Sequence, residues 1–337
     1  MNYPQYPYVS IICPCYNEEK CIFACLHSCL EQDYPKDKLE ILFVDGMSND
    51  KTRDIILAEA ITHKHMHLID NPNRIVPYAL NIGIEKAKGD IVVRIDAHAL
   101  FPSNYVSTLV HHLIALPNAQ NVGVPCITQT LGQTDKAKAI VAVLSNKWGV
   151  GNSAFRLGVQ KIQAVDTVPF GCWKKETLKT IGMFDTRLTR NQDIELNKRI
   201  AKAGGAIYLV PDSYCIYYAR ETYTKLAKNN FGNGKWNILT LYYTKALRSL
   251  SLRHFIPLLF LLSLLLPLLG IAVCPWIGLL AGISLICYLM LVCSISWNIS
   301  KEQSINPLCV IAALFTLHLS YGFGSLIGIF TLPFIKK

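Results

Sequence analysis

Two aspartates stand at the ends of two short apolar runs, and a third acid lies far downstream. Asp45 closes the run 39–44, Asp96 closes the run 91–95, and Asp193 is the third. Runs of this length between turn residues are typical of buried parallel strands. Because ligands bind beyond the carboxyl ends of the strands in an open α/β sheet, we expect Asp45 and Asp96 at one crevice. Acids in a crevice of nucleotide size suit a metal-bound nucleotide.

The segment after the second run offers ligands for a divalent cation. Asp96 and His98 are two residues apart, so in an extended chain their side chains point to the same side. Mg²⁺ and Mn²⁺ are commonly bound by one or two carboxylates together with phosphate oxygens. Chance often produces this spacing, so it is a weak signal by itself.

Three other polar positions each allow two interpretations. Asp193 precedes a helical pattern, where it is either the N-cap or a general base. Asn17 follows the first strand, where it is either a helix cap or part of a ligand loop. Asp45 is either an ordinary turn aspartate or a group that contacts a nucleotide base.

The elements that position these residues follow an alternating pattern. Apolar runs and helical patterns alternate with short connections up to about residue 120, which is typical of a doubly wound α/β sheet. The expected strands are 9–14, 39–45, 67–70, 91–96, 122–128, 165–172 and 207–210. The expected helices are 18–30, 52–61, 77–88, 103–116, 136–148, 176–181 and 193–203.

The C-terminal part of the chain has the composition of a membrane segment. Residues 255–297 carry no charged side chain, and 308–335 form a further apolar stretch. One spanning helix needs only ~20 residues, so the first stretch is expected to form two helices that break near Gly270 and Pro275. The alternative, a buried pair of core helices, does not explain so many apolar segments in a row. The number of true crossings stays open, because three would leave Lys336 and Lys337 outside.

The residues before the first span predict its orientation. Lys245, Arg248 and Arg253 favour a cytoplasmic front domain and a multi-pass protein of the cell (inner) membrane. Basic and aromatic residues mix over 222–253, which favours helices on an anionic membrane surface over a solvated helix face. No signal-peptide pattern is visible, and the twelve cysteines are expected to stay reduced. We therefore divide the chain into 1–220, an α/β domain; 221–253, interfacial helices; and 254–337, two or three transmembrane helices.

Six motifs taken in order resemble a known family. They are P-C-Y-N-E-E, V-D-G-M-S-N-D-K-T, A-L-N-I-G-I, G-D-I-V-V-R-I-D-A-H, F-G-C-W-K-K-E-T and N-Q-D-I-E-L-N-K-R. Each is weak alone, but their order and spacing resemble the family 2 glycosyltransferases of the GT-A fold. Within that family the chain looks most like the membrane-anchored branch typified by succinoglycan-biosynthesis enzymes. The likeness runs from about Val9 to Trp236.

The resemblance implies a role for each matching residue. On the donor side it implies nucleotide contacts from Pro14, Tyr16, Asn17, Glu18, Asp45, Arg74, Asn81 and Asp96. It implies a metal site at Asp96 and His98, a catalytic base at Asp193, and an acceptor-side loop at Gly171 and Cys172. The implied fold is a Rossmann-like GT-A nucleotide-sugar-binding domain followed by a C-terminal α-helical transmembrane region.

The chain also departs from the family pattern. Gly46 follows Asp45 where the family often has a second aspartate, His98 replaces the second acid of D-x-D, and Gln192 replaces a glutamate. The motif Q-x-x-R-W of processive polymerases is not present, and residues 229–236 occupy its place. The absence of the Q-x-x-R-W motif argues against a chain-extruding polymerase.

The expected activity is an inverting, Mg²⁺- or Mn²⁺-dependent transfer of a sugar from a nucleoside-diphosphate sugar. A UDP-sugar is favoured, the acceptor is a lipid-linked saccharide of bacterial-type polysaccharide assembly, and no nucleic acid is involved. One alternative is transfer to a polyprenyl phosphate. Another is a catalytically degenerate subunit that binds nucleotide sugar or glycan in an export complex. A dinucleotide-dependent dehydrogenase is disfavoured, because no G-x-G-x-x-G follows the first strand.

Overall fold

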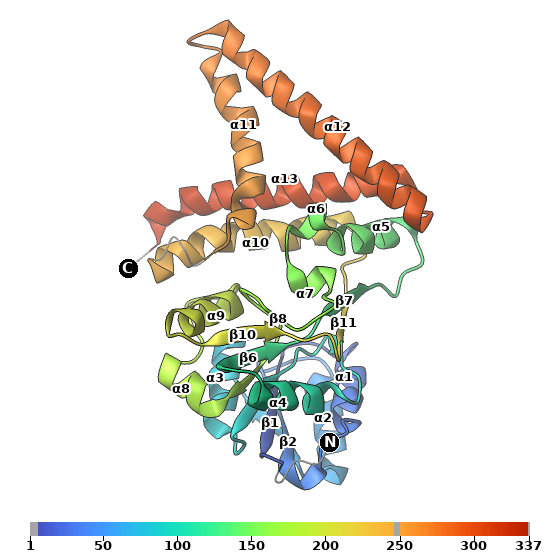
Figure 1. Cartoon of the computed structure of the whole chain (residues 1–337), viewed down its shortest axis with the longest axis vertical. Coiled ribbons are helices and arrows are strands. Elements are labelled where there is room, and N and C mark those ends of the chain that lie inside the picture. The colour runs from blue at the N-terminus through green and yellow to red at the C-terminus, as the bar shows by residue number, and fades with distance from the viewer. Residues whose placement is uncertain (1–5, 246–249, 336–337) are drawn as a thin grey trace. The chain divides into compact units, whose positions relative to one another are not determined.

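The computed structural model describes residues 6–245 and 250–335, and the chain divides into two compact units (Figure 1). The first unit comprises Met1–Ile127 and Leu157–Tyr217, and the second comprises Thr128–Arg156 and Tyr218–Lys337. Three of the basic residues on which the predicted membrane orientation rests lie outside the described residues: Arg248, Lys336 and Lys337.

An eight-stranded sheet forms the centre of the first unit. Its strands lie in the order β3-β2-β1-β4-β9-β6-β10-β8. Their bounds are β1 Val9–Cys15, β2 Leu39–Asp45, β3 Met66–Asp70, β4 Ile91–Arg94, β6 Ala119–Gly123, β8 Gln163–Ala164, β9 Cys172–Lys174 and β10 Ala206–Leu209. Every residue of β1 and β2 is buried, as predicted for strands covered on both faces.

The first four strands are parallel and in step. Cys15 pairs with Asp45 and Asp45 with Asp70, so β1, β2 and β3 end at the same level. The intervening helices are α1 Ile22–Leu30, α2 Thr52–Thr62, α3 Val76–Lys86 and α4 Tyr105–Ala115. Helix α3 lies close to β1, because a Cβ on Gly83 would meet Ile12 Cγ2 at 2.5 Å. The predicted alternation of parallel strands and helices is confirmed in this half.

The second half of the sheet is less regular. Strand β9 lies between β4 and β6 and is antiparallel to both. Helices α8 (Lys175–Ile181) and α9 (Gln192–Lys202) accompany this half. A second, three-stranded sheet is made by β5 (Ala99–Leu100), β11 (Cys215–Tyr218) and β7 (Cys126–Gln129), and the latter two carry the chain from one unit to the other.

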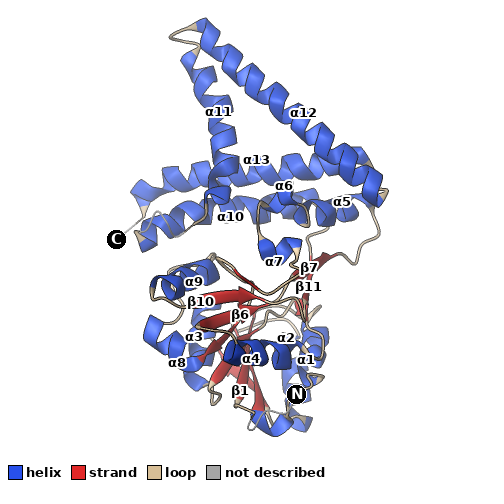
Figure 2. Cartoon of the chain, in the orientation of Figure 1, coloured by secondary structure: helices blue, strands red, loops and turns tan. Residues whose placement is uncertain are grey.

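The second unit is almost entirely helical (Figure 2). Its helices are α5 Asp135–Leu144, α6 Lys147–Val150, α7 Ala154–Leu157, α10 Tyr223–Thr244, α11 Ile256–Gly270, α12 Gly278–Gln303 and α13 Pro307–Thr331. Within the described residues, three segments are long and apolar enough to cross a membrane, namely Leu252–Gly270, Pro275–Gln303 and Pro307–Phe334. This agrees with the apolar stretches of the sequence.

The two structural units differ in one segment from the domains expected from the sequence. Residues 128–156 were expected in the front domain, yet they pack with the C-terminal helices. The Gly132 N–H donates to Glu221 Oε1 (2.7 Å), and His318 Nε2 lies 2.9 Å from Trp148 O. The expected helix 136–148 is also broken, because the Asn146 side chain caps α6 as a separate turn.

Candidate active site

The loops that follow β1 and β2 are joined by hydrogen bonds. Asn17, which has a left-handed backbone (φ 56°), lies at the centre of this network. Each bond runs from a backbone N–H of one loop to a side chain of the other: Asn17 N to Ser48 Oγ (2.8 Å), Glu18 N to Thr52 Oγ1 (2.8 Å), Glu19 N to Asp50 Oδ2 (3.1 Å) and Asn49 N to Asn17 Oδ1 (2.9 Å). The two loops therefore form one framework at the carboxyl edge of the sheet.

Asp50 carries an electrostatic signature of this framework. Its slight burial favours the neutral carboxyl, but hydrogen bonds from Thr52 and from the Glu19 N–H outweigh this and hold the pKa of Asp50 below its ordinary value. The ionised form of Asp50 therefore stabilises the joined loops.

Asp45 lies beneath this framework with a fully buried side chain. It accepts hydrogen bonds from the Ser48 N–H (2.9 Å), from the Ser48 hydroxyl and from Arg53 Nη1 (2.7 Å). Arg53 also pairs with Asp70 at the end of β3 (2.8 Å). Asp45 thus lies at the predicted sheet edge, where it anchors Arg53, and its contact with a base stays a prediction.

Tyr16 and Gly46 shape the surface above Asp45. The Tyr16 side chain is exposed, and a Cβ on Gly46 would lie 3.1 Å from both Tyr16 Cδ2 and Arg74 O. Glycine at position 46 lets the ring and the Arg74 loop approach, which gives a packing reason for this departure from the family pattern. Arg74 itself is exposed, with a left-handed backbone (φ 63°), and Pro14 is buried within β1.

Asn81 has a structural task in α3. Its Nδ2 donates to Phe184 O (2.9 Å), and its Oδ1 accepts from the Phe184 N–H (3.0 Å). Both ends of the amide are therefore used to hold the loop after α8. Its predicted place near the donor stays a prediction.

Asp96 is held by a buried arginine. Arg94 Nε and Nη2 lie 3.1 and 3.3 Å from the two carboxylate oxygens of Asp96, and Arg94 is only 5% exposed. Its guanidinium also lies 6.0 Å from the centre of the Phe170 ring, and Nη1 has no hydrogen-bond partner among the described residues. Sequence reasoning missed Arg94. The available signal was a charged residue inside an apolar strand, which requires a partner once buried.

The charge of Arg94 connects two predicted site residues. Burial alone would lower the pKa of the Arg94 guanidinium, but the negative charges of Asp96 and Asp193 raise it above its ordinary value. Asp96 and Asp193 therefore both stabilise the charge of this one buried guanidinium.

His98 meets the loop after β1. Its Nδ1 lies 3.6 Å from Glu18 Oε1, and its ring lies 5.8 Å from that of Tyr217. Among residues 6–245 and 250–335 no group of three His, Cys, Asp or Glu side chains has the geometry of a metal site. Asp96 is 20% exposed, however, and a carboxylate has lone pairs beyond the two that Arg94 engages. Asp96 therefore keeps lone pairs for a cation that takes its other ligands from phosphate oxygens, and a metal contact of His98 stays a prediction.

Asp193 lies in the first turn of α9. The N-cap of this helix is Asn191, with a left-handed backbone (φ 62°), so the interpretation of Asp193 as the N-cap was wrong. The neighbouring acid Glu195 is engaged by Arg199 at 2.7 Å. Arg199 also donates to the carbonyl oxygens of Ile181 and Met183, both at 2.6 Å. The contacts of Arg199 therefore hold the first turn of α9 in place, while the Asp193 side chain stays partly exposed.

Gly171 and Cys172, which form the predicted acceptor-side loop, lie in a tightly packed segment. Gly171 has φ 111°, and a Cβ there would lie 2.6 Å from Asn121 Oδ1 and from the Trp173 ring. Its carbonyl accepts from the Arg94 N–H (2.9 Å). The Cys172 thiol is fully buried, and this burial raises its pKa. A contact of Gly171 and Cys172 with an acceptor stays a prediction.

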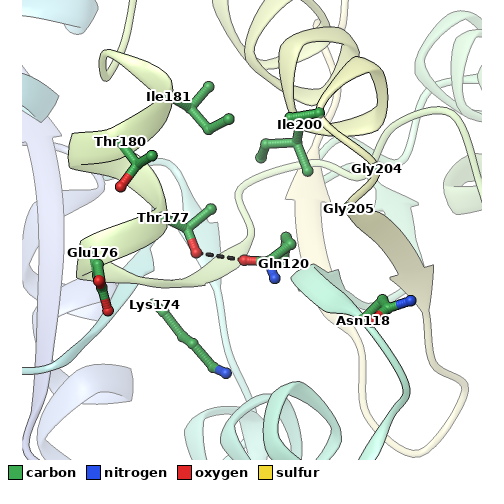
Figure 3. Close-up of a pocket in the computed structure, with 11 residues that line it drawn as sticks. Asn118, Gln120, Lys174, Glu176, Thr177, Thr180, Ile181, Ile200, Gly204 and Gly205 are labelled. Carbon is green, nitrogen blue, oxygen red and sulfur yellow. Dashed lines mark hydrogen bonds between the residues drawn. The ribbon is translucent and has the colours of Figure 1, made fainter.

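Two hollows lie at the opposite, amino-terminal edge of the sheet. One of about 390 Å³ is shown in Figure 3, where Gln120, Thr177 and Ile200 face the space. The other, of about 480 Å³, shares Lys174 with it. Because Lys174 pairs with Ile91, the first residue of β4, both hollows lie away from Asp96. None of the predicted site residues lines either hollow.

Comparisons with known proteins show the family and the fold to which the chain is similar. A family model described as "Glycosyl transferase family 2" matches residues 10–170. The chain is 32% identical over 234 residues, which are 67% of this chain and 72% of the relative, to a dolichyl N-acetyl-α-D-glucosaminyl phosphate 3-β-D-2,3-diacetamido-2,3-dideoxy-β-D-glucuronosyltransferase of Methanococcus voltae. It is 30% identical over 250 residues, or 74% of each chain, to the succinoglycan biosynthesis protein ExoA of Rhizobium meliloti (strain 1021).

A solved structure shares the fold. The mannosyltransferase PcManGT from Pyrobaculum calidifontis, in complex with GDP-Man and Mn²⁺, matches with a TM-score of 0.61 and 23% identity. The match covers 96% of this chain and 88% of that one. At this identity the likeness concerns the fold, and the predicted fold class is confirmed.

Proposed function

We infer the function from one premise, which is that the chain belongs to glycosyl transferase family 2 and is a glycosyltransferase similar to the succinoglycan biosynthesis protein ExoA. We propose that it transfers a sugar from a nucleoside-diphosphate sugar, with a UDP-sugar favoured, to a lipid-linked saccharide, with inversion at the anomeric carbon. The relative from Methanococcus voltae, whose name gives a dolichyl-linked sugar phosphate as acceptor, supports the lipid-linked class.

One observation carries the proposed mechanism. Arg94 bonds the Asp96 carboxylate directly and interacts electrostatically with Asp193. A residue that binds the donor diphosphate and a residue that accepts a proton must act within the length of one sugar ring. Their shared neighbour supports that proximity, although the site roles themselves are our proposal.

The donor is bound by the framework of the first two loops. Tyr16 offers an exposed ring and Arg74 an exposed cation, while Asp45 keeps Arg53 in place beneath them. Asp96 and His98 would hold Mg²⁺ or Mn²⁺, and such an ion, when bound, offsets the negative charge that grows on a departing nucleoside diphosphate.

Asp193 acts on the acceptor. Its carboxylate takes the proton of the acceptor hydroxyl as the hydroxyl oxygen forms a bond to the anomeric carbon. The bond from that carbon to the diphosphate oxygen breaks, and the nucleoside diphosphate leaves with the electron pair. Because attack and departure occur on opposite faces of the carbon, the configuration inverts.

The membrane segments explain how such an acceptor is found. In the part of the chain that the structure describes, three helices have the length and composition to cross a bilayer. We propose that they tether the catalytic unit to the cytoplasmic face of the inner membrane, so that the search for a lipid-linked acceptor is confined to a surface. Confinement raises the effective concentration of the acceptor without any further contact.

The test is a donor screen with the full-length chain in membranes. Labelled UDP- and GDP-sugars are supplied with an extracted lipid acceptor, and label is counted in the lipid fraction. We expect one donor to label the lipid fraction only while a divalent cation is present, and a chelator to stop the transfer. Labelling of added polyprenyl phosphate would instead support that acceptor. If no donor were transferred or hydrolysed, the proposal of an enzyme would fail.

A further inference from the structure

The three apolar helices of the second unit differ in how they are packed. The most apolar windows of the first two candidate spans are only 11% and 17% buried, whereas that of the third, which contains α13, is 39% buried. A helix surrounded by lipid shows little burial by its own protein. The neighbours of α13 therefore decide whether it crosses the membrane.

Helix α10 accompanies α13 along most of its length. Glycines permit backbone contact: a Cβ on Gly234 would lie 2.0 Å from Tyr321 O, and one on Gly324 would lie 2.0 Å from Phe231 O. Nearer the start of α13, the Tyr223 hydroxyl donates to Cys309 O (3.0 Å). Figure 1 shows the two helices side by side, so any orientation assigned to α13 must be shared by α10.

Helix α10 is unsuited to the hydrocarbon region. It carries the lysines Lys225 and Lys228 on its exposed side and Lys235 partly exposed, and it is not among the segments apolar enough to span. A charged side chain inside the bilayer is costly, and several on one helix are more so. Basic residues beside aromatic ones are instead typical of a helix that lies at the headgroup level.

The middle of α13 contacts a polar segment. His318 Nε2 lies 2.9 Å from Trp148 O in α6, and Lys147 beside it is exposed. Helix α5, which carries exposed Lys136 and Lys138, also packs on α13. If α13 crossed the bilayer, its midpoint would bring Lys147 to the bilayer centre.

The hairpin of α11 and α12 leaves this layer in another direction. A Cβ on Gly322 would lie 2.6 Å from Pro257 O, so α11 begins beside the middle of α13 rather than beside one end. Figure 1 shows α11 and α12 rising away from α10 and α13. At the turn of the hairpin Trp276 is 77% exposed and no charged residue is nearby, as in chains that reach a membrane interface.

We propose that α10 and α13 lie together in the plane of the membrane surface, and that the α11–α12 hairpin alone among the described helices crosses the bilayer and returns. The partner of the α10–α13 layer is the headgroup region of an anionic bilayer, with the lysines of α10 toward the headgroups and the exposed apolar residues Leu308, Phe323 and Phe330 of α13 toward the acyl chains. The chain then ends on the face from which α11 enters, which is the cytoplasmic face in the function proposed above. This removes the conflict between three crossings and the terminal lysines.

The first test locates the end of the full-length chain. Green fluorescent protein folds and fluoresces on the cytoplasmic side, whereas alkaline phosphatase is active outside, so each is fused after Lys337 in turn. We expect a fluorescent fusion and an inactive phosphatase. As a control, phosphatase inserted at the hairpin turn after Cys274 should be active. An active phosphatase after Lys337 would establish three crossings and overturn the proposal.

The second test measures depth and does not depend on a fusion. Nitroxide labels are placed on cysteines at Leu308, Phe323 and Phe330 of the full chain, with the exposed Cys287 and Cys293 replaced by serine. Collision rates with lipid-soluble oxygen and a water-soluble nickel complex give the depth of each label in anionic vesicles. We expect all three labels at one shallow depth and a label at Ile286 of α12 much deeper. A label at Phe323 deeper than those at both ends would mean that α13 crosses.

Both tests are independent of catalysis. If sugar transfer failed while these depths were observed, the proposed reaction would fall and the membrane arrangement would stand. If transfer succeeded and the C-terminus lay outside, the reverse would hold.

Discussion

The two halves of the first unit are built differently. In the half proposed to bind the donor, β1, β2 and β3 run parallel and end at the same level, and hydrogen bonds from backbone N–H groups join the loops after β1 and β2. In the half proposed to bind the acceptor, β9 is antiparallel to β4, and the pairing of β10 with β6 shifts register between Ala206 and Ile207. The acceptor half depends on long-range side-chain pairs such as Asn121 with Asn197 (2.7 Å). We therefore expect changes on the donor side to alter binding and changes near Asp193 to alter rate.

The largest effect is expected at the proposed base. Asp193→Asn should lower kcat by about 10²–10⁴-fold, because the amide cannot accept the acceptor proton, while donor affinity stays nearly unchanged. Turnover and donor binding are measured on the same preparation. The matched control is Asp135→Asn, an exposed acid in the first turn of α5, which should be neutral. Full activity of Asp193→Asn on a hydroxyl acceptor would remove the mechanism.

The second-largest effect is expected at Arg94, which contacts Asp96 and interacts electrostatically with Asp193. Arg94→Lys keeps the charge but loses the two-point contact with Asp96, and we expect the affinity for Mn²⁺ to fall about 10- to 100-fold. Titration of activity with Mn²⁺ measures it, and excess metal should restore part of kcat. Arg187→Lys is the control, since Arg187 makes the same kind of contact with Asp185 two residues away but on the surface. Equal Mn²⁺ affinities for Arg94→Lys and wild type would show that Arg94 does not support a metal site.

A smaller effect is expected from the donor surface. In Gly46→Ala the new methyl group would press on Tyr16 and the Arg74 carbonyl, each at 3.1 Å. We expect KM for the donor to rise by up to about tenfold, which corresponds to ~1.4 kcal/mol, with kcat unchanged. Gly282→Ala, where the Cβ meets nothing within 4 Å, is the control. A fall in kcat without a change in KM would contradict the division of labour between the halves.

The smallest effect is a pH dependence of stability. Because the pKa of Asp50 is lower in the folded chain than its ordinary value of 3.8, its ionised form stabilises the fold above that pH, and the contribution is lost as the pH falls through the folded value. Asp50→Asn should therefore melt below wild type at neutral pH, and the difference should close below about pH 3.8. Thermal unfolding of the full chain over a pH series tests this, and a difference that grew in acid would refute it.

Much of the donor half could be predicted from sequence, because its signals are local. The strand predicted to end at Asp45 is confirmed as β2, and the strand predicted to end at Asp96 is β4, which ends two residues earlier. The helices between them lie close to their expected ranges. The strand expected over 165–172 was wrong, because only Cys172 of that range lies in a strand, which is β9. The three residues of β9 carry no periodic signal, and their antiparallel pairing joins segments about 80 residues apart. The role of Arg94 was missed because the residue lies inside an apolar strand pattern. The N-cap of α9 is Asn191, whereas the sequence had offered Asp193 as a candidate. The placement of 128–156 depends on contacts with helices far along the chain.

Strand β9 has a consequence for how such enzymes diversify. Its three residues are the seam along which the parallel strands β1–β4 meet the later strands, through pairs such as Val93 with Cys172. Because this seam is narrow, we expect that exchanging the later segments between relatives would leave the loops after β1 and β2 intact. Chimeras that join related chains at Gly171 should then keep the parent's donor and adopt the newcomer's acceptor.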